Sequence, residues 1–265
     1  MASTAPVALL LHGWEGSSDS TYVLSLGAEL LAAGFTVVRL NLRDHGQTHA
    51  LNRELFHSCR LPEVAEAVRR VAQRFAPAPL HLAGFSLGGN FLLRVAAAPQ
   101  LPANVANVVA ICPVLHPDRA LTALETGSAL YHGYFVRRWS RSLRLKQQAW
   151  PRDFDFDALL NIKRLRPMTA ALVRDHTEYG HIDDYLEGYA ITGARLRTLA
   201  VPAFMICTDD DPIIPIRDLA LVFRHPLLTI CRLPRGGHCG LLENLGGPSF
   251  ADRFTLAAFT APKSG

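Results

Sequence analysis

The chain has 265 residues, of which 49% are hydrophobic and 19% are charged, a composition typical of a soluble globular protein. A net charge of +4 is too small to indicate a nucleic-acid partner by itself. No apolar run approaches the roughly 20 residues that span a bilayer, and the first residues lack the basic segment of a signal peptide. The five cysteines are scattered without a CxxC pair, so we predict no disulfide framework, no metal site and a cytoplasmic location.

Short aliphatic or β-branched runs alternate with segments of helical spacing along most of the chain. The predicted strands are residues 6–11, 35–42, 80–85, 107–112, 202–208 and 227–233, and the predicted helices are residues 25–34, 61–75, 90–98, 216–224 and 249–259. Such alternation indicates right-handed βαβ units and a mostly parallel sheet with helices on both faces. The sequence therefore predicts an α/β fold, a doubly wound sheet of about six strands, with residues 1–265 forming one domain.

Residues 113–200 interrupt this rhythm with helical patterns and no convincing strand. A structureless loop of this length is improbable inside a compact domain. We therefore predict a helical cap, or lid, inserted before the penultimate strand. Within it, residues 137–146 (RRWSRSLRLK) carry five cations. We interpret them as a solvated helix face, with peripheral contact to anionic lipid as the alternative.

One serine stands between closely spaced glycines in the stretch HLAGFSLGGNFLL, residues 81–93. A phosphate-binding loop would require Gly-x4-Gly-Lys-Ser/Thr, and this turn has no lysine. A dinucleotide motif would require G-x-G-x-x-G after the first strand, where LHGWEGSS offers only Gly13 and Gly16. Gly84 and Gly88 instead flank Ser86 as in a nucleophile elbow, where small neighbours allow a tight strand-to-helix turn that exposes the serine Oγ.

A serine nucleophile needs a base, and the base needs an orienting carboxylate. Asp209, Asp210 and Asp211 directly follow the strand at 202–208, and His238 follows the next strand. The chain order serine, acid, histidine suits a hydrolase built on a parallel sheet. From the residues alone, the choice among the three aspartates stays open.

These motifs together resemble the α/β-hydrolase superfamily. LHGWEGSS, NLRDHG, LFHS, GFSLGGNFLL, DDPIIP and GGHCGLLE are most similar to its YheT/ABHD1–3 (EMB8-like) branch, and they extend over nearly the whole chain. In this family the acid begins a D-x-x-x-P motif, which implies Asp211 as the triad acid, with Asp210 as the alternative and Asp209 as a cap of the turn.

The resemblance also implies an oxyanion hole, a pair of backbone N–H groups that bind the negatively charged oxygen of the reaction intermediate. Leu87 follows the nucleophile, and Trp14 follows the HG motif, in which His12 braces the loop. Two features depart from the branch. Asp44 replaces the glycine of the R-G-H-G-x-S loop, and the chain begins at the strand before the oxyanion loop, so we expect a trimmed sheet and no membrane anchor.

The predicted activity is that of a serine esterase with the triad Ser86, His238 and Asp211, acting through an acyl-enzyme on small-molecule esters. The resemblance implies carboxylic esters of short or medium acyl chain, acylglycerols and phospholipid-like esters included, with no metal or organic cofactor. Alternatives are acyl transfer to an alcohol or thiol, cleavage of thioesters or amides, and a non-catalytic binding protein. We expect the substrate contacts in the cap, residues 113–200.

Four further residues have two interpretations each. His45, His57 and Ser58 could line the pocket or make structural hydrogen bonds. Cys239, next to His238, is interpreted as a packing residue, with redox sensitivity as the alternative.

Overall fold

The computed structural model describes residues 5–243 and 246–261. Its six strands pair in parallel in the order β2-β1-β3-β4-β5-β6. In chain order they are β1 (Val7–Leu11), β2 (Thr36–Leu40), β3 (Leu80–Phe85), β4 (Val105–Ile111), β5 (Ala203–Thr208) and β6 (Leu228–Leu233). The predicted α/β fold with a doubly wound sheet of about six strands is confirmed.

Helices cover both faces of the sheet, which explains why its central strands are continuous apolar runs. The covering helices are α1 (Thr21–Ala32), α2 (Leu61–Phe75), α3 (Leu87–Ala96) and α9 (Phe250–Thr260). Because successive side chains of a strand point to opposite faces, neighbouring residues of β1 enter different cores. Leu9 packs in the core that contains Val68 of α2, whereas Leu10 packs in the core that contains Leu26 of α1.

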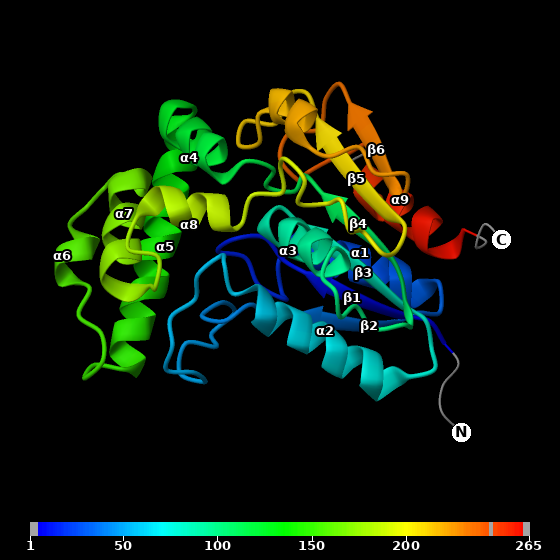
Figure 1. Ribbon diagram of the computed structural model, residues 1–265, viewed down its shortest axis with the longest axis horizontal. Coiled ribbons are helices and arrows are strands. Elements are labelled where there is room, and N and C mark those ends of the chain that lie inside the picture. Colours follow the sequence, from blue (N-terminus) through cyan, green and yellow to red (C-terminus); the bar gives the residue numbers. More distant parts are fainter. Residues whose placement is uncertain (1–4, 244–245, 262–265) are drawn as a thin grey trace.

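Five helices and no strand lie between β4 and β5, a segment that falls wholly within the described residues. They are α4 (Pro117–Thr126), α5 (Ala129–Ala149), α6 (Asp157–Leu160), α7 (Leu165–His176) and α8 (Ile182–Gly188). They gather at one end of the molecule, and the sheet with its covering helices forms the other (Figure 1). The apolar core is continuous between the two parts, since Leu143 of α5 and Leu172 of α7 belong to the same cluster as Leu9.

The predicted helix at residues 216–224 is wrong in type and length. The segment forms a short 3-10 helix, η1 (Ile216–Leu221), and then leaves helical geometry. Two contacts account for the early end. Val222 makes a β-bridge with Gly193, and the buried carboxylate of Asp218 is held by Arg119 at 2.7 Å. Pairing with neighbouring segments therefore replaces the helical hydrogen bonds that the sequence pattern predicted.

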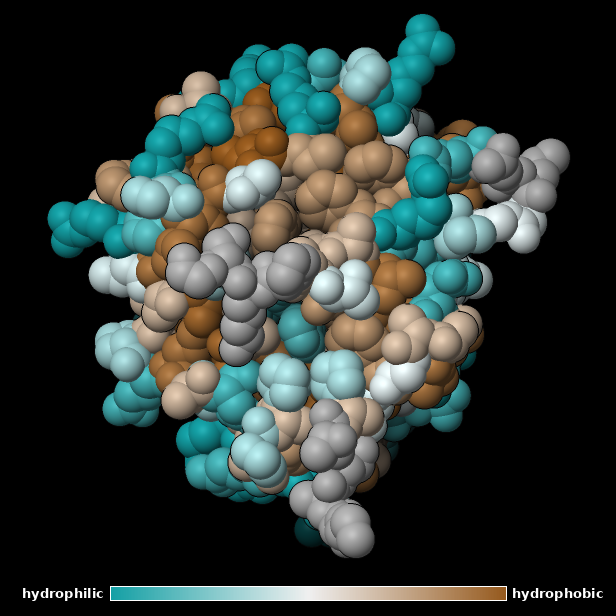
Figure 2. All heavy atoms as spheres, turned by 90° about the vertical axis from the view of Figure 1, so that its right-hand side faces the viewer, coloured by the Kyte–Doolittle hydropathy of each residue, from teal (hydrophilic) through white to brown (hydrophobic). Residues whose placement is uncertain are grey.

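The face of the molecule farthest from α5–α7 has a broad apolar band across its middle with hydrophilic residues around the margin (Figure 2). None of the helices in the described part of the chain combines the length and the hydrophobicity that a membrane span requires. The predicted domain limits of 1–265 include residues 1–4, 244–245 and 262–265, which lie outside the described residues.

Candidate active site

Ser86 occupies a strained turn between β3 and α3. Its φ of 51° and ψ of −116° are unusual for a residue with a side chain. The flanking glycines make this turn sterically accessible. A Cβ on Gly84 would lie 2.5 Å from the carbonyl carbon of Gly88, and a Cβ on Gly88 would lie 2.5 Å from the backbone oxygen of Leu11. The Ser86 side chain thus stands at the first turn of α3, where backbone N–H groups favour negative charge.

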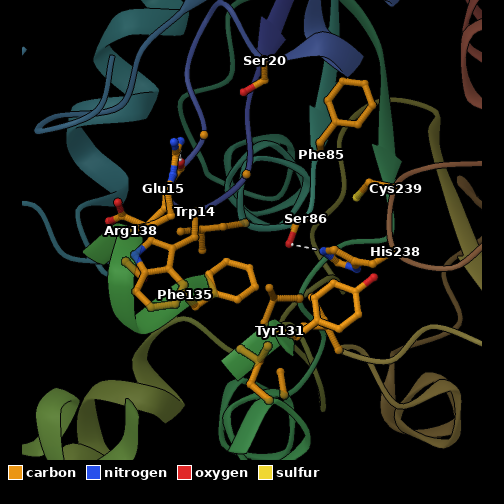
Figure 3. A pocket seen from close by; sticks show the side chains of 18 of the residues that line it. Trp14, Glu15, Ser20, Phe85, Ser86, Tyr131, Phe135, Arg138, His238 and Cys239 are labelled. Atoms are coloured by element: carbon orange, nitrogen blue, oxygen red, sulfur yellow. Dashed lines mark hydrogen bonds between the residues drawn. The ribbon is translucent and has the colours of Figure 1, made fainter. Parts of the chain in front are cut away.

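The structure brings Ser86, His238 and Asp211 into one hydrogen-bonded chain. Ser86 Oγ lies 3.0 Å from His238 Nε2 (Figure 3). His238 Nδ1 lies 2.8 Å from Asp211 Oδ2. The other carboxylate oxygen of Asp211 accepts the N–H groups of Ile213 and Ile214, which fixes its orientation. The ring nitrogen facing Asp211 therefore carries the proton, and the nitrogen facing Ser86 is free to accept one.

The electrostatics of His238 result from two opposing effects. Burial lowers the pKa of the imidazole, but the hydrogen bond and the negative charge of Asp211 outweigh it, so the pKa is raised above its ordinary 6.5. The other two aspartates of the run face elsewhere. Asp210 accepts the N–H groups of Gly236 and Gly237, and Asp209 pairs with Arg232 rather than capping its turn.

The loop between β1 and α1 lies beside Ser86. It turns tightly through a hydrogen bond from the Gly16 N–H to the Gly13 carbonyl, with Glu15 at a positive φ of 57°. Among the described residues, no acceptor pairs with the N–H of Trp14, and the N–H of Leu87 is one of the free donors that begin α3. Neither predicted oxyanion donor therefore has a hydrogen-bond acceptor within the described part of the chain.

His12 holds this loop in place through two hydrogen bonds. Its Nε2 accepts the Leu42 N–H at 3.1 Å, so the proton resides on Nδ1, which donates to the Gly13 carbonyl at 2.7 Å. Burial lowers the pKa of His12 to about 4, which keeps the ring neutral. The His12 ring is therefore locked in one tautomer and holds the loop through the Gly13 carbonyl.

Helix α5 contacts the same loop from the other side. The Trp14 ring stacks on Phe135 with centroids 5.3 Å apart and planes 6° apart, and Trp139 meets it edge-on. The Arg138 guanidinium donates to the Glu15 carbonyl at 2.7 Å. Glu15 is 9% exposed, and burial raises the pKa of its carboxyl to about 8, partly opposed by Arg138. The contact between Glu15 and Arg138 was not predictable from the sequence, because no spacing rule connects residues so far apart.

A buried ion pair fixes the far end of α5. Lys146, with no exposed side-chain surface, donates to Asp44 at 2.8 Å and to the carbonyl groups of Asn52 and Glu54. The prediction of a solvated face at residues 137–146 is therefore wrong for Lys146, which is buried. It is only partly right for Arg138, which is half-buried and donates to Glu15. Arg141 is exposed, as predicted.

Ser86 opens into an apolar cavity of about 600 Å³ beneath the helices between β4 and β5. Leu121, Phe135 and Leu172 line it from α4, α5 and α7. His57 and Ser58 also line the cavity, in agreement with the interpretation of them as pocket residues. Cys239 lines it as well. His45 does not, because it is buried with its Nδ1 at 2.6 Å from the Arg43 carbonyl.

Comparison with known proteins gives a consistent set of relatives. The family model of the α/β hydrolase fold matches residues 6–142. Phospholipase ABHD3 of Bos taurus is 23% identical over 92% of this chain and 60% of its own length, and the putative esterase YheT of Escherichia coli is 27% identical over 80% and 63%. The esterase Pf2001 of Pyrococcus furiosus superposes with a TM-score of 0.57 at 12% identity, over 96% of this chain and 78% of the esterase.

The predicted resemblance to the YheT/ABHD1–3 branch is confirmed by these relatives. The chain spans about 60% of the length of these two curated relatives. The likeness to Pf2001 concerns the fold alone.

Proposed function

The chain belongs to the α/β-hydrolase fold family, and from this premise we propose that it is a serine hydrolase that cleaves carboxylic esters. The observation that carries the proposal is the hydrogen-bonded chain from Ser86 Oγ through His238 to Asp211, with distances of 3.0 and 2.8 Å. A strained turn, an oriented base and two free backbone donors converge on one serine, and this set serves acyl transfer.

In the proposed reaction, Ser86 Oγ attacks the ester carbonyl while His238 Nε2 takes its proton. Asp211 keeps the imidazole in the required tautomer and stabilises its cationic form. The backbone N–H groups of Trp14 and Leu87 bind the developing oxyanion. His238 then protonates the leaving alcohol, and water hydrolyses the acyl-enzyme by the same steps in reverse order.

We propose that residues 113–200 act as a cap that forms the acyl-binding pocket. A cavity of about 600 Å³ lies within the range of small-molecule sites, and its apolar lining favours an aliphatic acyl group over a charged one. The relatives named phospholipase and esterase support an ester substrate of this kind. We propose lipid-like esters of short or medium acyl chain as the substrate class. A cytoplasmic location remains a prediction.

A fluorophosphonate probe tests the proposal directly. We expect the folded protein to be labelled at Ser86, and we expect Ser86→Ala to lower kcat for a soluble short-chain ester by about 10⁶-fold. Ser58→Ala is the matched control, because Ser58 lines the same cavity but donates no hydrogen bond to His238. Unlabelled protein, or equal loss in both variants, would contradict the proposal. Adding a competing alcohol and analysing the products separates hydrolysis from acyl transfer.

A further inference from the structure

Two thiols and one ring nitrogen of His238 form a compact cluster beside the Ser86 turn. The Sγ atoms of Cys112 and Cys239 and a nitrogen of His238 all lie within 4.8 Å of one another. Cys112 directly follows β4, and Cys239 stands in the loop after β6, so the two meet where parallel strands end at the same edge of the sheet. Both thiols are free of disulfide bonds.

This donor set has the chemistry of a zinc site. Zn²⁺ binds thiolate sulfur and imidazole nitrogen in tetrahedral geometry, at about 2.3 Å and about 2.0–2.1 Å respectively. Those bond lengths place ligand atoms about 3.6–3.8 Å apart, so the cluster, whose ligand atoms lie within 4.8 Å of one another, needs to contract by about 1.2 Å at most. His238 and Cys239 line the large cavity, which supplies both an entry path and an open fourth position. Figure 3 shows Cys239 and His238 beside Ser86 at the cavity wall.

We propose that Cys112, His238 and Cys239 bind Zn²⁺ and that the bound ion switches the hydrolase off. The ion accepts a lone pair from His238 and one from each thiolate, the two thiol protons pass to solvent, and no oxidation state changes. Coordination at Nε2 displaces the Ser86 hydroxyl, and coordination at Nδ1 displaces Asp211. Either way the imidazole no longer accepts the serine proton. The inhibition rests on the proposed esterase activity, whereas the metal binding does not.

The binding is tested first, in a Ser86→Ala protein that cannot turn over. Titration with Cd²⁺, a soft substitute for Zn²⁺, should give one equivalent of ultraviolet thiolate-to-metal absorption and a concentration-dependent rise in Tm. Both signals should vanish in the added variants Cys112→Ala and Cys239→Ala. Cys207→Ala is the matched control, because Cys207 is a buried free cysteine on β5. Circular dichroism checks that each variant is folded. Absorption that survives Cys112→Ala, or no absorption at all, overturns the site.

The inhibition is tested second, with otherwise unaltered protein and a soluble short-chain ester. Zn²⁺ should stop turnover reversibly, EDTA should restore it, and Cys112→Ala should need at least tenfold more Zn²⁺ to lose half of its own metal-free rate. Metal that binds at the cysteines without slowing turnover overturns the inhibitory role. Metal binding in a protein that never hydrolyses an ester supports the site and counts against the proposed function, so the two failures are distinguishable.

Discussion

The hydrogen bond from Arg138 to the Glu15 carbonyl should control the rate of the chemical step without controlling substrate affinity. Arg138 lies on α5, and Glu15 follows the proposed oxyanion donor Trp14 in a left-handed conformation. A hydrogen bond from a charged donor contributes about 1.5–3 kcal/mol. If that energy holds the loop in place for the transition state, its loss in Arg138→Met lowers kcat roughly 12- to 140-fold, at about 1.4 kcal/mol per tenfold.

Steady-state kinetics on a soluble ester checks this prediction. An oxyanion donor acts on charge that develops only in the transition state, so kcat should fall while KM stays within about twofold. Arg138→Lys keeps a cationic donor and should recover part of the rate, whereas Arg137→Met, a change at an exposed neighbour on the same helix, should leave it unaltered. A folded Arg138→Met protein with unchanged kcat, or one whose loss lies wholly in KM, would refute the reasoning.

Three further changes have defined outcomes. Lys146→Met leaves the Asp44 carboxylate buried without its cation, so the free energy of unfolding should fall by about 3–5 kcal/mol in a denaturant titration, and Asp44→Asn in the same chain should recover part of it. Gly88→Ala places a Cβ against the backbone of β1, so fluorophosphonate labelling should drop sharply even where circular dichroism still reports a folded sheet. Because the pKa of His238 is raised above 6.5 and only the neutral ring accepts a proton, kcat/KM should increase with pH through a value above 6.5. In Asp211→Asn that limb should move to lower pH, and kcat should fall by about 10⁴-fold.

The strands and the placement of Ser86 and His238 were predictable from local patterns, whereas only the family resemblance selected Asp211 among the three aspartates. Buried parallel strands are continuous apolar runs, and the carboxyl ends of such strands meet at one edge, which is where Ser86, Asp211 and His238 stand. Helix boundaries were less predictable. α3 begins at Leu87 rather than at residue 90, because the tight turn at Ser86 puts the next residue directly into the helix.

The contacts that the sequence did not predict join segments that no periodicity connects. Arg138 and Glu15 are of this kind, and so are the Cys112 and Cys239 thiols. Their meeting depends on how the helices between β4 and β5 fold over the sheet and on how the loop after β6 returns to the end of β4. Neither arrangement leaves a spacing signal, and the scattered cysteines therefore predicted no metal site.

Asp44 shows how one departure from the family motif affects the whole cap. The motif has glycine at this position, and the backbone of Asp44 indeed has a φ of 56°, a conformation that aspartate tolerates better than most residues. Its carboxylate is buried, so it requires the Lys146 cation that α5 supplies. A buried ion pair adds little net stability, but it penalises any arrangement that separates its partners. The pair therefore fixes the register of α5, the helix whose Phe135 and Arg138 hold the loop of Trp14 against Ser86.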